Sequence, residues 1–142
     1  MAHPEYERLF CDTSYFYALL DSRDEFHSQA LGLSKEIEEY QIPLFASWEV
    51  VQETITLLRY RHSYEGCRIF IDQLLPNINV IVMTNEERQQ AIDRFKERAT
   101  EKELSLCDVL SRVLVKNRLG NPPCLTFDDD FEAMGLTVVR TL

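Results

Sequence analysis

Four acidic residues lie where a predicted strand or helix meets a loop. They are Asp12 in RLFCDTSYF, Glu53 in VVQETITLLRYR, Asp108 in LSLCDVLSRVL and Asp128 in CLTFDDDF. In an open parallel sheet the carboxyl ends of the strands share one edge, where ligands bind. Four carboxylates gathered there cannot all stay ionised without a cation. Because oxygen ligands of this kind suit Mg²⁺ or Mn²⁺, the pattern indicates a metal-dependent enzyme that acts on phosphate.

An alternation of strands and helices would bring these acids to one edge. Short apolar segments predict strands over 8–11, 43–46, 78–83, 122–127 and 136–140. Helices are predicted over 13–20, 21–40, 48–62, 64–75, 84–102 and 105–120, with a helical turn over 128–135. Near-continuous apolar strands with helices between them predict an α/β fold with a parallel sheet of about five strands, covered by helices on both faces.

Length and composition set the broad class of protein. The chain has 142 residues, of which 45% are hydrophobic, so we expect one globular domain over residues 1–142. No apolar run approaches the length of a membrane span, and MAHPEYERLF has no signal-peptide pattern, so we expect a cytoplasmic protein without a membrane partner. The cysteines and histidines lack zinc-site spacings, and three of the four cysteines lie in apolar stretches typical of the core.

The net charge of −9 argues against broad non-specific binding to nucleic acid, which depends on Lys and Arg. Net charge does not describe local charge, however. Two basic groups stand out, one of Arg59, Arg61, His62 and Arg68, the other of Arg112, Lys116 and Arg118. Each group is either a contact surface for RNA or an ordinary solvated helix face.

Asp12 and Glu53 each have a simpler explanation. Asp12 would serve as the N-cap of the following helix, although the hydroxyl groups of Thr13 and Ser14 beside it could orient metal-bound water. Glu53 flanks the apolar stripe of its helix and would be a solvated surface residue. Glu49 is its rival, one turn earlier on the same side.

Asp108 and Asp128 are open to the same doubt. Ser105 and Asp108 have the spacing of a capping box, and the apolar stripe that includes Leu106 and Val109 points away from Asp108. Asp128 would be an N-cap for the turn that follows it. Spacing alone therefore leaves both residues undecided.

Taken together, the four positions resemble the PIN domain family, and within it the VapC-type toxin ribonucleases. The segments that carry the resemblance are FCDTSYFYALLD, VVQETITLLRYR, LSLCDVLSRVLVKNR and LTFDDDFEAMGLTVV. On this pattern the family acids fall on Asp12, Glu53, Asp108 and Asp128, with Thr126 as a hydroxyl partner. The E-x-x-x-L-L-R run favours Glu53 over Glu49. The chain departs from the pattern in its longer acidic run, which adds Asp129 and Asp130.

The resemblance implies hydrolysis of RNA phosphodiester bonds with Mg²⁺ or Mn²⁺. Asp12 and Asp108 would bind the ion most directly, while Glu53 and Asp128 would hold its waters or a second ion. The expected supporting residues are Thr13, Ser14, Thr126 and Asp130, and the expected RNA contacts are Arg59, Arg61, Arg112 and Lys116. The resemblance also implies an antitoxin partner that blocks the site, and a homodimer.

Two other classes of protein remain open. A PIN-like domain could be a non-catalytic binding module, which the loss of one acid would have supported, but all four acids are present. A phosphotransfer protein of the haloacid dehalogenase or receiver kind also places an Asp after its first strand. The dehalogenase-like phosphatases have a second Asp two positions later, where this chain has Ser14.

Overall fold

A parallel sheet of five strands forms the centre of the protein. The computed structural model describes residues 6–98 and 103–141. The sheet order is β3-β2-β1-β4-β5, and the strands span Leu9–Cys11 (β1), Leu44–Ser47 (β2), Ile78–Ile81 (β3), Cys124–Leu125 (β4) and Val138–Val139 (β5). Every pairing is parallel, with Phe10 of β1 opposite Phe45 on one side and Cys124 on the other. This confirms the predicted sheet.

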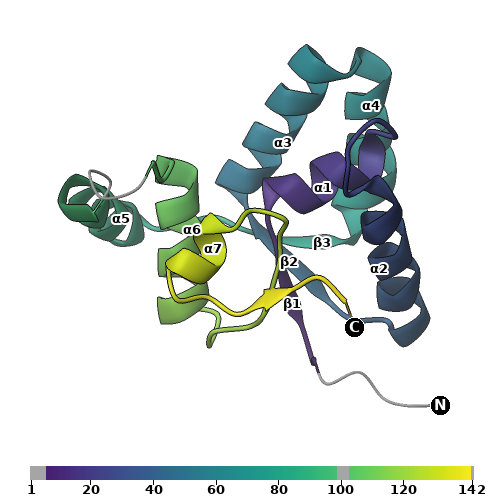
Figure 1. The fold of residues 1–142 in the computed structure, drawn as a ribbon. Helices are drawn as coiled ribbons and strands as arrows, with labels where there is room; N and C mark the ends of the chain where they lie inside the picture. The colour runs from purple at the N-terminus through teal and green to yellow at the C-terminus, as the bar shows by residue number, and fades with distance from the viewer. Residues whose placement is uncertain (1–5, 99–102, 142) are drawn as a thin grey trace.

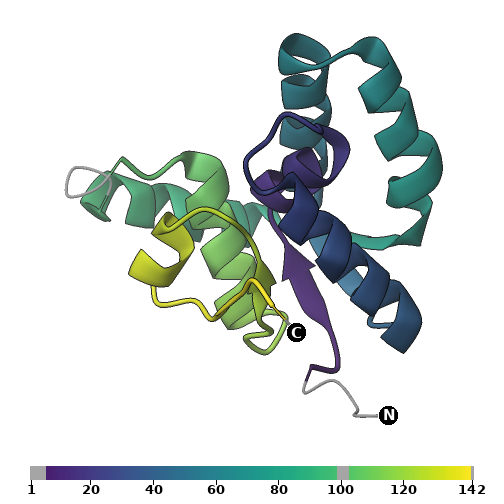
Figure 2. The ribbon, with the colours of Figure 1, turned by 45° about the vertical axis from the view of Figure 1, so that its right-hand side comes forward.

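Helices cover both faces of this sheet. They are α1 (Thr13–Leu20), α2 (His27–Tyr40), α3 (Trp48–Arg61), α4 (Tyr64–Ile69), α5 (Asn85–Arg98), α6 (Leu106–Asn117) and α7 (Asp130–Ala133). Helices α1 to α4 lie on one side of the sheet and α5 to α7 on the other, as the labels in Figure 1 and the same colours in Figure 2 show. This three-layer arrangement was expected, because right-handed crossovers place helices on opposite faces when the strand order reverses. No helix in the described parts of the chain has the length and apolar character needed to cross a membrane.

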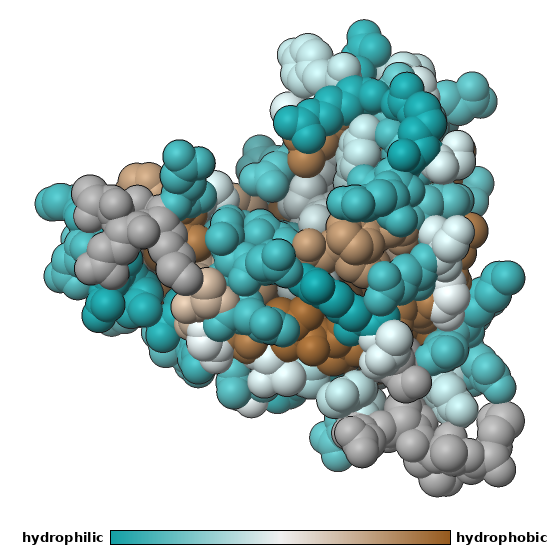
Figure 3. All heavy atoms as spheres, viewed as in Figure 1, coloured by the Kyte–Doolittle hydropathy of each residue, from teal (hydrophilic) through white to brown (hydrophobic). Residues whose placement is uncertain are grey.

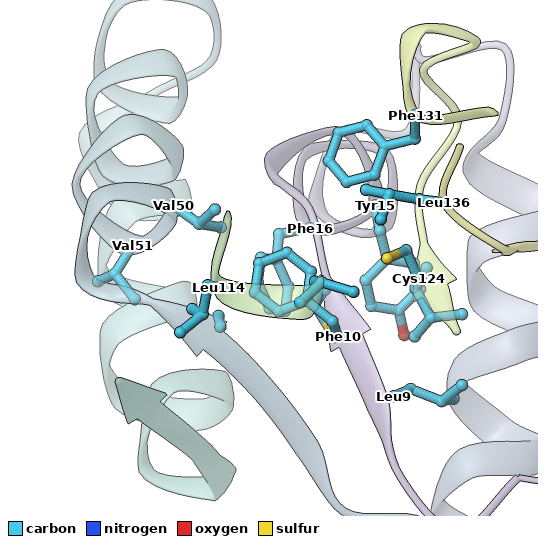
Figure 4. Close-up of a cluster of buried hydrophobic side chains, with 14 of the residues drawn as sticks. Leu9, Phe10, Tyr15, Phe16, Val50, Val51, Leu114, Cys124, Phe131 and Leu136 are labelled. Carbon is cyan, nitrogen blue, oxygen red and sulfur yellow. The ribbon is translucent and has the colours of Figure 1, made fainter. Parts of the chain in front are cut away.

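The core lies between the sheet and these two helix layers. All three residues of β1 are fully buried, as apolar side chains on a central strand must be. Figure 4 shows Phe10 of β1 close to Phe16 of α1, with Val50 and Leu114 from α3 and α6 nearby. Burial of such side chains contributes roughly 1.5–3 kcal/mol each, so the core fixes the positions of the helices that carry the acids.

The strand order reverses between β1 and β4. The chain leaves β1 for α1 on one face, whereas it leaves β4 for α7 on the other face. A crevice opens at the carboxyl ends of two strands that diverge in this way. Asp12 follows β1 directly, and Asp128 lies three positions after the end of β4.

Two helix predictions were wrong in their extent. The second helix begins at His27 and not at Asp21, because the Asp21 and Asp24 side chains accept hydrogen bonds from the backbone N–H groups two residues on. Such local bonds compete with helix formation. The helix predicted over 64–75 is α-helical only as far as Ile69, the end of α4. The chain then forms a π-helical turn (η1, Phe70–Leu74) and a 3₁₀ turn (η2, Leu75–Asn77).

The remaining differences are at element ends. The last two strands have only two residues each, and β3 stops before the exposed Val82. Leu106, expected on the apolar stripe of its helix, is 40% exposed because it is the first residue of α6. Helix α5 is described as far as Arg98, so its predicted end at 102 lies outside the described residues.

Candidate active site

Asp12 is held by two hydroxyl groups that come from distant parts of the chain. Its Oδ2 accepts hydrogen bonds from Ser14 Oγ at 2.8 Å and from Thr126 Oγ1 at 2.9 Å. It also accepts a longer bond of 3.4 Å from the Ser14 N–H as the N-cap of α1. Asp12 is therefore both the N-cap of α1 and a residue of the cleft. Burial raises the pKa of Asp12 to about 6, although the hydrogen bonds from Ser14 and Thr126 oppose the rise.

The hydroxyl of Ser14 is engaged with the protein itself. Besides its bond to Asp12, Ser14 Oγ accepts a hydrogen bond from the Phe127 N–H at 2.9 Å. Ser14 therefore ties the end of β1 to the segment after β4. Thr13 Oγ1 is buried and has no hydrogen-bond partner within the described protein, and Thr13 lines the cleft.

Asp108 points inward from the first turn of α6. Ser105 Oγ accepts a hydrogen bond from the Asp108 N–H at 3.1 Å, so the predicted capping interaction is present. The Asp108 side chain is nevertheless buried, with only 8% of the residue exposed. Burial and the charges of Asp12 and Asp128 raise the pKa of Asp108 to about 7. A capping residue on a solvated surface would not have these acidic neighbours.

Of the three aspartates after β4, Asp128 and Asp130 form an acidic cluster with Asp108, and Asp129 does not. Asp108, Asp128 and Asp130 each offer a carboxylate oxygen within 4.8 Å of the others. Asp128 Oδ1 also accepts a hydrogen bond from the Asp130 N–H at 2.9 Å, but the N-cap of α7 is Asp129, so the N-cap prediction for Asp128 was wrong. Asp129 instead points outward and forms a 2.8 Å ion pair with Arg140. The ambiguity among the three aspartates is thus reduced to Asp128 and Asp130.

The helical glutamate in the cleft is Glu53, as the resemblance favoured. Glu53 lines the same cleft as Asp12, Asp108 and Asp128. Glu49 pairs with Arg88 at 3.6 Å and does not line this cleft. Burial and the nearby Glu53 carboxylate raise the pKa of Cys107 well above its usual range, so this thiol stays protonated at neutral pH.

The cleft that these residues share has a volume of about 340 Å³. One wall is α3, which contributes Glu53, Leu57 and Arg61 at intervals of four residues, on one helix face. The segment between α1 and α2 contributes residues that sequence reasoning missed, Asp24, Glu25 and Phe26. Periodicity could not have found them, because they lie in a turn that was predicted as helix. The surface is hollowed between the side formed by α5 and α6 and the side formed by α3 (Figure 3).

Only one of the basic residues selected from the sequence lines this cleft in the described structure, and it is Arg61. Arg59 lies over the ring of Tyr64 at 5.9 Å, and Arg68 forms an ion pair with Asp72. Arg118 forms an ion pair with Glu87.

Arg112 and Lys116 follow Asp108 on α6 at intervals of four residues. The Nε–H of Arg112 donates a hydrogen bond to the carbonyl of Met134, and Lys116 is partly buried. Burial, with Arg94 and Arg98 nearby, lowers the pKa of Arg112. The basic surface on this side of the protein therefore includes two α5 arginines that the sequence analysis did not single out.

A parallel sheet in the order 3-2-1-4-5, with acidic side chains gathered at its switch point, defines a class of α/β domains with an acidic cleft at the carboxyl ends of the strands. A PIN domain family model matches residues 9–136, and the chain belongs to this family. It is 26% identical over 108 residues to a VapC ribonuclease of Archaeoglobus fulgidus, covering 74% of this chain and 68% of the relative.

Comparison with solved structures agrees with this family. The crystal structure of Mycobacterium tuberculosis VapC20, described as a sarcin-ricin loop cleaving toxin, matches with a TM-score of 0.79 and 29% identity. The match covers 94% of this chain and 99% of that one. Membership of the PIN family removes the phosphotransfer class of protein from consideration.

Proposed function

We propose that this protein is a metal-dependent endoribonuclease that hydrolyses RNA phosphodiester bonds in the acidic cleft. The observation that carries the proposal is the convergence of Asp12, Glu53, Asp108 and Asp128 on one cleft from four separate elements. Two of these residues are buried carboxyl groups with raised pKa values, which is typical of functional sites. The names of the two relatives, a VapC ribonuclease and a sarcin-ricin loop cleaving VapC20 toxin, support the same activity.

The donor set fits a divalent ion such as Mg²⁺ or Mn²⁺. Oxygen ligands lie about 2.0–2.1 Å from Mg²⁺, so two ligands of one ion are at most about 4.2 Å apart. The oxygen atoms of Asp108, Asp128 and Asp130 lie within 4.8 Å of one another, close enough for a bound ion to draw them together. Asp12 is outside this group of three; the hydroxyl groups that hold it both donate to its Oδ2, so Oδ1 would be the oxygen that contacts a bound ion. Asp130 is therefore a candidate ligand and not only a supporting residue.

Each residue of the cleft would have a separate role in the reaction. A bound divalent ion supplies positive charge for the phosphate and lowers the pKa of an attacking water. Ser14 and Thr126 fix the orientation of Asp12, as outer residues do at metal sites. Glu53 lies on the α3 wall, where its carboxylate can hold a water and accept its proton. Arg61, two turns further along α3, is placed to contact a neighbouring phosphate.

We infer that the biological role is that of a toxin in a toxin–antitoxin pair that acts in the cytoplasm as a homodimer. The toxin role is supported by the relatives, which are a VapC ribonuclease and the VapC20 toxin. An acidic cleft would be blocked by an antitoxin whose Arg or Lys enters it and pairs with the carboxylates. Expression of the chain alone should arrest growth, and co-expression of a small neighbouring reading frame should restore it.

The direct test is an RNA cleavage assay with matched aspartate variants. Wild-type protein should cleave labelled structured RNA in Mg²⁺ or Mn²⁺ and lose activity in EDTA. Asp12→Asn and Asp108→Asn should abolish cleavage, whereas Asp93→Asn on the exposed face of α5 should not. Cleavage by both cleft variants would refute the mechanism. RNA binding by the wild-type protein without cleavage would show a non-catalytic PIN-like binding module.

A further inference from the structure

The cleft contains an aromatic pair that the metal site does not need. Phe26 and Phe127 stack face to face, with ring centroids 4.6 Å apart and planes inclined by 2°. Both residues line the cleft, and Phe127 directly precedes Asp128. Phe127 is buried, whereas Phe26 is partly exposed. Phe26 packs against the hydrophobic core and also lines the cleft, so part of its ring remains in contact with solvent, and a ligand that covered this part would bury further apolar surface.

The position of Phe26 is fixed before any ligand arrives. Asp24 Oδ1 accepts a hydrogen bond from the Phe26 N–H at 2.9 Å. The turn that carries Phe26 is anchored by Asp21, which binds the Arg23 guanidinium and the Tyr17 hydroxyl, and Arg23 in turn donates to the Arg61 carbonyl. Phe127 contacts one face of the Phe26 ring, and Asp24 holds the Phe26 backbone. Phe26 therefore loses little conformational entropy when a ligand binds.

Leu57 adds an apolar side chain to the cleft from the α3 wall. It lies one helical turn from Glu53 and one turn from Arg61 on the same face of α3. Along α3, Leu57 therefore occupies the interval between the Glu53 carboxylate and the Arg61 guanidinium. A nucleic acid presents the same alternation, because each flat apolar base is flanked by charged phosphates.

We propose that Phe26, supported by Phe127, is a stacking platform for one unpaired base next to the scissile phosphate. This inference rests on the proposed ribonuclease function and names the substrate class as RNA with an unstacked nucleotide at the cleavage site. A base in a regular duplex cannot reach the ring, since it is already stacked on both faces. The cleft volume of about 340 Å³ is at the small end for ligand pockets, which suits a single nucleotide and excludes a helix.

The experiment measures binding to the Asp12→Asn protein, which is expected not to cleave RNA, in Mg²⁺. The probes are a fluorescein-labelled RNA hairpin with a four-nucleotide loop, the same hairpin with an abasic site at each loop position in turn, and a fully paired duplex of the same stem. Stacking on an aromatic ring contributes about 1–3 kcal/mol per base, so Phe26→Leu should weaken hairpin binding roughly 5- to 150-fold. Phe26→Trp should retain it, and duplex binding should not change.

A coupling measurement separates stacking from a merely structural role. One abasic position should weaken binding to the Asp12→Asn protein and have no further effect once Phe26→Leu is present. Phe95→Leu, a partly buried phenylalanine on α5 outside the cleft, is the matched control and should preserve the abasic effect. An abasic penalty that is the same with Phe26 or Leu at this position overturns the platform, even if wild-type protein cleaves the hairpin. Absence of both cleavage and binding overturns the ribonuclease function and the platform together.

Discussion

The side-chain oxygens of Ser14 and Thr126 lie 3.1 Å apart, although 112 positions separate them in the chain. Each hydroxyl has one hydrogen, and both hydrogens point to Asp12 Oδ2. As acceptors, the same oxygens bind the Phe127 and Asp128 N–H groups. This network joins the ends of β1 and β4 at the switch point, so the position of Asp12 depends on residues from both halves of the sheet.

Replacement of Thr126 by Val should remove a hydrogen bond to Asp12 and leave all the acidic residues of the cleft in place. The variant loses a hydrogen bond that lowers the pKa of Asp12, so this pKa should rise above about 6 in metal-free protein. Cleavage should fall roughly 10- to 100-fold, the usual cost of losing an outer partner at a metal site. NMR titration of the Asp12 carboxyl and steady-state kinetics measure the two effects.

Thr126→Ser keeps the hydroxyl and should restore most of the activity. Thr54→Val is the matched control, because Thr54 is also buried but its hydroxyl donates to the Val50 carbonyl within α3. Equal losses of activity in Thr126→Val and Thr54→Val would show that packing, and not the Asp12 network, is responsible.

Neutralising Asp108 should stabilise the metal-free protein. The pKa of Asp108 is about 7 in the folded protein against 3.8 for a free side chain, so the folded state binds this proton more tightly. The stabilising contribution is then complete below pH 3.8 and is lost as the pH rises through about 7. In EDTA, Asp108→Asn should therefore raise the melting temperature at pH 8, by roughly 3–10 °C for about 1–3 kcal/mol, and by less at pH 5.

With added Mg²⁺ the wild-type protein should have a higher melting temperature than Asp108→Asn, because only the wild type retains all the acidic residues that would bind the ion. Asp93→Asn, on the exposed face of α5, should leave both melting temperatures close to wild type. A lower melting temperature for Asp108→Asn at pH 8 would mean that its capping bond with Ser105 outweighs the repulsion from Asp12 and Asp128.

The two neighbours of Asp128 should differ in their effect on metal binding. Asp130 offers an oxygen within 4.8 Å of Asp108 and Asp128, whereas the Asp129 side chain pairs with Arg140 and is 92% exposed. Asp130→Asn should weaken Mn²⁺ binding about tenfold or more, since one charged ligand is lost. Asp129→Asn should leave the affinity unchanged. Isothermal titration with Mn²⁺ compares them, and equal affinities would remove Asp130 from the ligand set.

The sequence was sufficient for the architecture because its signals are physical and local. Apolar strands such as β1, together with helical periodicity, determine the layers, and the resemblance of four acidic segments indicated which residues meet. Strand ends were harder to predict, since β4 pairs over only Cys124 and Leu125, and Thr126 and Phe127 after it lie in a loop. The outward turn of Asp129 depends on Arg140, a tertiary contact that no local pattern encodes. The same holds for Phe26, which reaches the cleft because side-chain bonds of Asp21 and Asp24 replace the helix predicted there.

Arg61 should be the basic residue whose loss most weakens RNA binding. It lines the cleft two turns beyond Glu53, and its carbonyl, not its side chain, accepts the hydrogen bond from Arg23. Arg61→Glu therefore leaves that backbone contact in place and changes the charge. In the Asp12→Asn background we expect affinity for hairpin RNA to fall roughly tenfold, with a salt dependence shallower by about one phosphate contact.

Arg68→Glu is the control, because Arg68 is equally basic but pairs with Asp72 on an exposed surface. Fluorescence anisotropy over a salt series measures both slopes. If the two reversals weaken binding equally, the effect is one of long-range charge, and Arg61 makes no specific contact with the RNA.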